Sequence, residues 1–241
     1  MRSPRQTLVG LLLATAIFAA WLALTLCGFF AVDLATVHPL VAVALVAALC
    51  WLDVGLFIVA HDAMHGSLAP GRPALNRWIG TVALTAYAGF SFGRLTPKHM
   101  QHHKSPGTAD DPDFHAPAPT HVLRWYLAFF REYFGVRELL VLTVLVAALT
   151  IVVGVPYANL LLFWALPAIL SSIQLFLFGT FLPHAHRGDA FADAHNARSS
   201  GYPWLLSLLS CYHFGYHHEH HRHPHLPWWR LPSARALHPK P

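Results

Sequence analysis

Charged side chains are scarce in this sequence. Only 11% of its residues are Asp, Glu, Lys or Arg, and 55% are hydrophobic. About a quarter of the residues of an ordinary soluble domain are charged. So little charge beside so much apolar surface is typical of a protein embedded in a bilayer. The 241 residues suit a single domain, 1–241, with no length left for a separate electron-transfer module.

Cysteine is also rare, and several cofactor motifs are missing. Cys27, Cys50 and Cys211 lie in or beside apolar runs without C-x-x-C spacing, so they predict neither a disulfide nor a thiolate metal site. No G-x-G-x-x-G follows a strand pattern, and no haem motif occurs. The metalloprotease signature H-E-x-x-H is absent as well. Redox chemistry in this chain would therefore need electrons from a separate donor.

Long apolar runs indicate the fold class. A helix needs about 20 residues to cross the apolar core of a bilayer, and four segments reach or approach that length: 8–30, 40–60, 139–155 and 157–182. Three shorter stretches are predicted as re-entrant or interfacial helices: 78–93, 122–136 and 204–212. The prediction is an all-α integral membrane protein with four transmembrane helices plus these shorter ones.

Cations are distributed unevenly along the chain. The connections 31–39 and 156–159 contain no Lys or Arg, so the positive-inside rule places both outside and the rest of the polar chain, with both termini, in the cytoplasm. All of the 19 histidines except His38 then fall on the cytoplasmic side. We interpret this one-sided distribution as a shared histidine site.

Three histidine boxes repeat a helical spacing. They are HDAMH, HMQHH and HHEHH, and their predicted metal ligands are His61, His65, His99, His102, His103, His217, His220 and His221. Residues three or four apart share a helix face, so each box gives a helix one metal-facing edge. Eight imidazoles exceed the needs of one ion, which predicts two metals. Imidazole binds iron, zinc, copper and nickel alike, so the ligands leave the ion open.

Further site residues follow from the surroundings of the boxes. The string FGTFLPHAH, at the end of the last apolar run, offers His184 as a ninth ligand, with His186 as its alternative and His218 as the alternative to His217. Ligand histidines usually donate their second nitrogen to an oxygen, and the candidate carboxylates are Asp53, Asp62, Asp110, Asp111, Asp113 and Glu219. The run around Pro112 equally fits a polar turn. The isolated His38, His115, His121 and His238 are interpreted as solvated or capping residues.

Longer strings around the boxes resemble the bacterial β-carotene ketolases, within the membrane fatty-acid desaturase and hydroxylase group. The strings are GLFIVAHDAMHG, HHKSPGTADDPDF, SIQLFLFGTFLPH, HNARSS, HFGYHHEHH and PWWRLP. Ser105 departs from the members that carry histidine there. The resemblance implies that the nine histidines hold two non-haem irons in a bacterial inner membrane. It also implies oxidation of the C4 methylene of a β-ionone ring to a ketone by two O2-dependent hydroxylations, giving echinenone and canthaxanthin from β-carotene.

The residues support this chemistry on separate grounds. An allylic C–H bond beside a polyene has no acidity for a general base to use, so its oxidation calls for a redox-active metal, which zinc is not. The net charge of +5 favours an acidic, ferredoxin-like electron donor over nucleic acid. The alternatives are a carotenoid hydroxylase, a fatty-acid desaturase or an alkane hydroxylase. A metal transporter is disfavoured, because only Asp53 and Gln174 approach the bilayer midplane.

Overall fold

The computed structural model describes residues 4–188 and 190–237, which form helices and loops without a strand. His238 lies outside these residues. The helices are α1 (Pro4–Phe30), α2 (Pro39–Met64), α3 (Pro73–Ala88), α4 (Phe92–Lys104), α5 (Val122–Tyr133), α6 (Val136–Ala147), η1 (Ala148–Val152), α7 (Tyr157–Leu160), η2 (Leu161–Ala165), α8 (Leu166–Phe176), η3 (Leu177–Phe181), α9 (Leu182–His184), α10 (Trp204–Cys211), α11 (His217–Arg222), η4 (Trp228–Arg230) and α12 (Leu231–Leu237). The all-helical prediction is confirmed for this part of the chain.

Three helices are long and apolar enough to cross a membrane. They are α1, α2 and the continuous helix Tyr157–His184, in which α7, η2, α8, η3 and α9 follow one another. The predicted span at 139–155 is instead part of a bent pair, in which α5 meets α6 and η1 at 75°. Gly135 is extended at the bend, and Glu138 caps α6 by accepting a hydrogen bond from the Gly135 amide at 3.1 Å. The count is therefore three spans, or four if the bent pair is one crossing.

Helix α2 lies at the centre of the bundle, in contact with α1, α3 and α8. Its second half, from Leu52 to Ala63, is buried almost without interruption, because neighbours cover all of its faces. Small residues let the helices approach closely. A Cβ atom at Gly28 would come within 2.7 Å of Phe163, and one at Gly55 would come within 2.7 Å of the Tyr212 ring.

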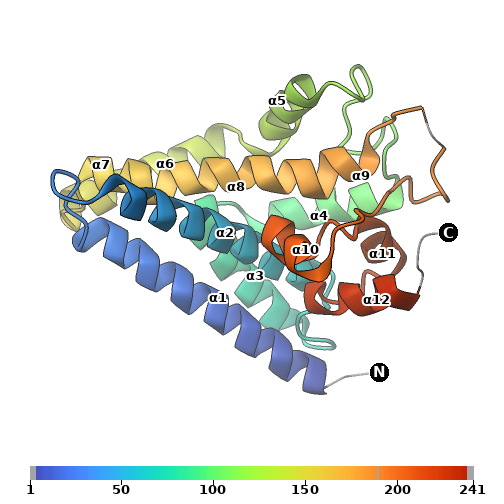
Figure 1. Cartoon of the computed structure of the whole chain (residues 1–241), viewed down its shortest axis with the longest axis horizontal. Helices are drawn as coiled ribbons and strands as arrows, with labels where there is room; N and C mark the ends of the chain where they lie inside the picture. The colour runs from blue at the N-terminus through green and yellow to red at the C-terminus, as the bar shows by residue number, and fades with distance from the viewer. Residues whose placement is uncertain (1–3, 189, 238–241) are drawn as a thin grey trace.

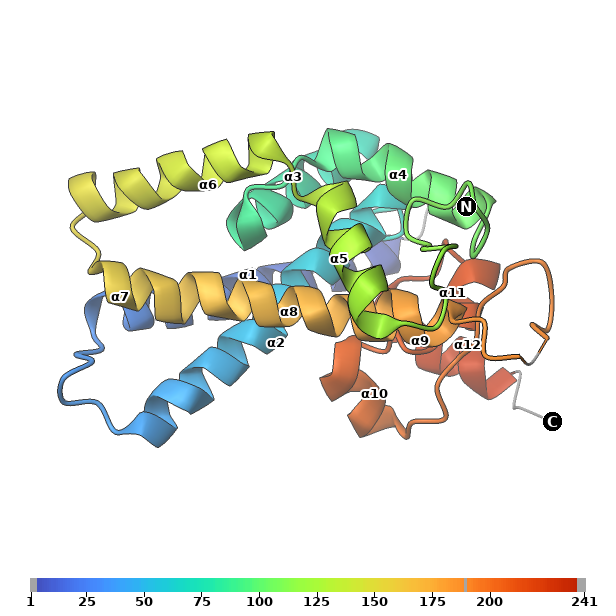
Figure 2. The ribbon, with the colours of Figure 1, turned by 90° about the horizontal axis from the view of Figure 1, so that it is seen from above.

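The two ends of the elongated bundle differ in what they carry. The connection from α1 to α2 and the connection from η1 to α7 lie together at one end (Figure 1). Helices α4, α9 and α11, which carry histidines, gather at the opposite end, next to α10 and α12 (Figures 1 and 2). The predicted short helices are present as α3, α5 and α10. The fold thus brings histidines from four distant stretches of chain to one end of the molecule.

Candidate metal centre

Nine buried or half-buried histidines form two adjacent clusters. The five-histidine cluster contains His61, His65, His99, His103 and His220. The four-histidine cluster contains His102, His184, His217 and His221. Within each cluster one nitrogen of every ring lies within 4.8 Å of the others. These are the nine residues that the sequence analysis singled out, and the fold brings all of them together.

The boxes on α4 and α11 divide their histidines between the clusters. On α4, His99 and His103 turn to the five-histidine cluster while His102 turns to the other. On α11, His217 and His221 serve the four-histidine cluster while His220 serves the five-histidine one. Successive residues of a helix differ by about 100°, so positions four apart nearly coincide in direction and the position between them diverges. Each short helix therefore faces two sites, not the one edge that the spacing suggested.

The end of α2 presents the first pair of histidines. His61 belongs to the last turn of the helix, and His65 is its C-cap residue, so the pair lies four positions apart on one face. Gly66 follows with φ +69°, a left-handed conformation that glycine adopts readily. The chain therefore leaves the helix immediately after its second ligand.

Helix α11 has only six residues and is anchored from outside. Glu219 accepts a hydrogen bond from Arg235 at 2.8 Å and another from the Ser199 hydroxyl. Ser199 in turn accepts from the backbone amide of His218 at 3.1 Å. The His218 ring lies 2.9 Å from Asp193 and is not part of either cluster. So short a helix has little stability of its own, and these contacts fix its position.

Oxygen atoms orient two rings of the four-histidine cluster. The His102 Nδ1 atom lies 2.9 and 3.0 Å from the two oxygens of Asp111. Asp111 also accepts from the Gly107 amide at 2.7 Å and the Asp113 amide at 2.8 Å. The His184 Nδ1 atom lies 2.7 Å from the Asn196 carbonyl oxygen. In both rings the Nδ1 partner turns Nε2 toward the cluster, which is how ligand histidines are commonly held.

The remaining predicted carboxylates have other surroundings. Asp113 lies 3.7 Å from His102 Nδ1 and accepts from the Tyr133 hydroxyl. Asp62 lies 3.7 Å from His61 Nδ1 and accepts from the Trp228 amide at 3.1 Å. Asp110 is exposed, and Asp53 accepts from Trp21 of α1 at 2.8 Å, two turns away from His61. Glu219 acts on α11 and not on a ligand ring.

The isolated histidines lie apart from both clusters. His38 caps the start of α2 and His121 caps the start of α5, each by accepting a backbone amide through Nδ1. His186, the alternative to His184, is exposed and packs on Phe114 and Phe191. Burial therefore distinguishes His184 from its near neighbour. The sequence contained no indication that the Asn196 carbonyl would be the partner of His184, apart from the place of Asn196 in the string HNARSS.

Burial and mutual proximity keep most cluster rings neutral. Burial, reinforced by His102, lowers the pKa of His65 to about 4, and burial with His65 lowers the pKa of His103 to about 2. The pKa values of His217, His220 and His221 are also lowered by burial and by neighbouring histidines. A neutral ring keeps the lone pair that binds a metal.

His102 differs from the other ligand rings. Burial lowers its pKa, but Asp113 and Asp111 outweigh that effect, so the pKa of His102 is raised. This direction agrees with an Nδ1–H donated to a carboxylate. The ring then presents Nε2 to the four-histidine cluster, where His221 Nε2 lies 3.2 Å away.

The donor atoms fit metal ions. Facing ring nitrogens stand 2.7 Å apart in His65 and His99, 2.9 Å in His103 and His220, and 3.0 Å in His217 and His221. Neighbouring ligands at about 2.1 Å from one ion are themselves about 3 Å apart. Both ring nitrogens of His61 and the Nε2 atom of His184 are buried without a hydrogen-bond partner. Buried polar atoms of this kind need a partner, and an ion in each cluster would supply one to His184 and to one nitrogen of His61.

An apolar cavity opens beside the clusters. His61, His99, His102 and His217 form one end of it. Aromatic and aliphatic side chains from α2, α5 and α8, among them Phe57, Phe130 and Leu175, form the walls. Asp113 is the one carboxylate among the described residues that line it. The sequence predicted α5 only as an interfacial helix, and its role as a cavity wall was missed because that depends on how it folds back over α8 (Figure 2).

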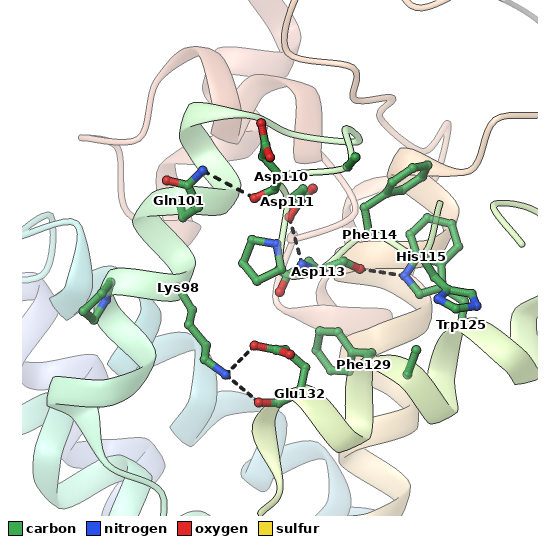
Figure 3. A pocket seen from close by; sticks show the side chains of 14 residues that line it. Lys98, Gln101, Asp110, Asp111, Asp113, Phe114, His115, Trp125, Phe129 and Glu132 are labelled. Atoms are coloured by element: carbon green, nitrogen blue, oxygen red, sulfur yellow. Dashed lines mark hydrogen bonds and ion pairs between the residues drawn. The ribbon is translucent and has the colours of Figure 1, made fainter. Parts of the chain in front are cut away.

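A second pocket, open and acidic, lies on the surface beyond Asp113. It has a volume of about 510 Å³ and is lined by Asp110, Asp111, Asp113 and Glu132. Figure 3 shows Lys98 reaching Glu132, with a distance of 2.6 Å between ammonium and carboxylate. None of the nine cluster histidines lines this pocket.

Comparison with known proteins identifies the family of the chain. The fatty acid desaturase family model matches residues 35–142 and 133–240. A β-carotene ketolase of Paracoccus sp. (strain PC1) is 53% identical over 95% of this chain and 93% of its own length. A zeaxanthin 4-ketolase of Chlamydomonas reinhardtii is 38% identical over 98% of this chain and 55% of its own. The chain therefore belongs to the fatty acid desaturase family and, within it, to the β-carotene ketolases.

Proposed function

We propose that this chain is a carotenoid 4-ketolase that oxidises the C4 methylene of β-ionone rings, converting β-carotene to echinenone and canthaxanthin. The observation that carries the proposal is the apolar cavity whose one end is formed by four histidines of the two clusters. The similarity to ketolases over almost the whole chain supports the substrate class. The cavity has the chemistry expected for a hydrocarbon ring, and the histidines have the chemistry expected for an oxidation centre.

The reaction balances as two successive oxygenations. In the first, the ring CH2, one O2, two electrons and two protons give CHOH and one water. In the second, the same inputs convert CHOH to a gem-diol and another water, and the gem-diol loses water to leave the ketone. Two irons, one in each cluster, would supply the O2 activation that oxidation of a non-acidic allylic C–H bond requires. The nine histidines would hold them.

The protein side chains position the substrate and protect the centre. The phenyl rings of Phe57, Phe90 and Phe130 enclose the ring of the substrate and exclude water from the cavity. Asp111 holds the His102 ring in one orientation, and the Asn196 carbonyl does the same for His184. A substrate in the bilayer would reach the cavity past α5, whose Phe129 and Tyr133 form part of its wall.

The charges of the chain support a proposal for its electron donor and for its orientation in the membrane. The net charge of +5 favours an acidic, ferredoxin-like donor, since opposite charge speeds encounter. The cation distribution supports placing the histidine end in the cytoplasm, and we propose that the membrane is a bacterial inner membrane. Residues 1–241 act as one unit in this proposal.

Pigment analysis tests the proposal. The chain is produced in cells that accumulate β-carotene, and the extracted carotenoids are separated and identified by mass. Products with 4-keto groups are expected. Products with 3-hydroxy groups, or unchanged β-carotene, would overturn the proposal in favour of a hydroxylase or another di-iron enzyme. Purified protein should contain iron, and near-stoichiometric zinc without iron would contradict the assigned chemistry.

A further inference from the structure

Three of the five histidines of the first cluster, His65, His99 and His103, are half-buried, and His65 lines a surface pocket. A pocket of about 420 Å³ opens between the end of α2 and the first turns of α3 and α4. His65 and Gly66 line it on one side, and Pro73, Arg77 and Pro97 line it on the other. His65 thus lines the pocket, and its Nε2 atom lies 2.7 Å from Nε2 of His99 in the cluster. No other side chain is needed to connect this surface to the cluster.

The surface around this pocket is cationic. Arg77 is on its wall, Arg72 adjoins the lining residue Pro73, and Arg94 adjoins the lining residue Gly93. All three arginines are exposed, and none has an acidic partner within 4.0 Å among the described residues. The sequence from 63 to 109 contains five Lys or Arg and no Asp or Glu. Lys98, one of these five, pairs with Glu132, whereas the charge of the three arginines is not neutralised by an acidic side chain of the described residues.

The pocket beside His65 and the acidic pocket of Figure 3 have opposite character. The pocket of Figure 3 carries four carboxylates against Lys98 and has no cluster histidine on its walls. The pocket beside His65 carries arginine and a cluster histidine. An acidic protein is repelled from the first and attracted to the second, because complementary potentials steer encounter and fix the orientation of docking.

We propose that the pocket beside His65, with Arg72, Arg77 and Arg94, is the docking surface of the acidic one-electron carrier that reduces the centre. This inference rests on the proposed function, because each oxygenation consumes two electrons. Two reduced carriers dock in turn and leave oxidised, and their electrons enter at His65. The apolar cavity stays occupied by substrate throughout, since His65 is not among the residues that line it.

Charge reversal tests the docking surface. The protein is placed in phosphatidylcholine nanodiscs with β-carotene, and electrons come either from reduced [2Fe–2S] ferredoxin, regenerated by its reductase and NADPH, or from dithionite. Arg77→Glu and Arg94→Glu should each lower the ratio of the ferredoxin-driven rate to the dithionite-driven rate by about tenfold. Arg124→Glu is the matched control, because Arg124 is an exposed arginine on α5, which Figure 1 places away from α3. Its ratio should not change.

Binding gives a readout that is independent of turnover. The affinity of oxidised ferredoxin for the nanodisc-embedded protein should weaken with salt, since exposed charges are screened beyond about 10 Å at 0.1 M. Arg77→Glu should reduce that salt dependence, whereas Arg124→Glu should preserve it. Unchanged affinity and rate ratio in both Arg77→Glu and Arg94→Glu would overturn the docking surface.

Other outcomes separate the two proposals. No 4-keto product with either electron source would contradict the proposed function itself. Product with dithionite but none with ferredoxin would overturn the acidic carrier as the partner. If the effect of Arg77→Glu appears in nanodiscs with anionic lipid and is absent in phosphatidylcholine, the pocket binds a lipid headgroup and the docking proposal fails.

Discussion

The two histidine clusters differ in the hydrogen-bond partners of their ligand rings. In the four-histidine cluster, Asp111 and the Asn196 carbonyl hold the outer nitrogens of His102 and His184. In the five-histidine cluster, no ring nitrogen of a described residue hydrogen-bonds to an oxygen, and the rings contact one another. In the four-histidine cluster two rings are thus oriented by the surrounding protein, while the Nδ1 atoms of His217 and His221 have no hydrogen-bond partner. The five-histidine cluster has one more ligand and depends on its ion for order.

This difference predicts unequal behaviour of the two ions. Outer partners fix the ring orientation and raise the basicity of a ligand, so an ion in the four-histidine cluster binds a prepared site. An ion in the five-histidine cluster must order rings such as His65, which also borders an open pocket. We expect the ion of the five-histidine cluster to be removed first by a chelator.

Loss of a ligand histidine should give the largest effect, and it can be tested in each of the two clusters. His220→Ala removes a ligand of the five-histidine cluster, and His217→Ala removes one of the four-histidine cluster. Each should abolish ketolase activity and lower bound iron by about half, because each cluster loses a donor that no neighbour replaces. Both variants should stay inserted in the membrane, since the spans carry insertion.

Carotenoid analysis and metal content of the purified variants provide the measurement. His121→Ala is the control, because His121 caps α5 and lies outside both clusters. Full turnover by His220→Ala would refute its assignment as a ligand.

Removal of the carboxylate that orients a ligand ring should have the next largest effect. It would leave His102 without an oxygen partner, as the rings of the five-histidine cluster are. Asp111→Ala frees the His102 ring and should weaken iron binding in the four-histidine cluster by about 10- to 100-fold. The measurement is the rate and amount of iron lost to a chelator. Asp110→Ala is a matched control one residue away, because Asp110 is exposed and is expected to leave iron retention unchanged. Equal losses in the two variants would contradict the special role of Asp111.

Weakening the anchor of α11 should have the smallest effect and act on both clusters together. Glu219→Gln removes a charged partner of Arg235 and should lower the free energy of unfolding by about 2 kcal/mol. Thermal unfolding in detergent, followed by tryptophan fluorescence, measures the change. Glu132→Gln is the control, because the pair of Glu132 with Lys98 is largely exposed and such pairs contribute little. A loss of iron from only one cluster in Glu219→Gln would contradict a shared anchor.

Helical spacing identified the histidines, because an i, i+3, i+4 pattern depends only on the local backbone. The same pattern did not reveal that His102 and His220 turn away from their neighbours, since that depends on where the second helix lies. Hydropathy located α1 and α2 well. The segment 139–155 passes as a span only together with α5, from which the 75° bend at Gly135 separates it, so the count of four stays a prediction.

Oxygen partners were harder to predict than ligands. Asp110, Asp111 and Asp113 share one short turn, and only the folded loop distinguishes the carboxylate that reaches His102. The partner of His184 is a backbone carbonyl, which every residue possesses. Asp53, a costly carboxylate inside an apolar run, was expected behind a ligand, and its hydrogen bond instead joins α2 to α1 through Trp21.

Helices α4 and α11 each carry histidines of both clusters. The backbone repeat of these two helices therefore sets the separation between the clusters, and an ion in each cluster would keep that separation. Side-chain motion changes this spacing little, whereas a shift of α4 against α11 changes it at once. Contacts that lie outside the clusters, such as those of Glu219 with Ser199 and Arg235, would therefore influence how far apart two ions held by the clusters lie.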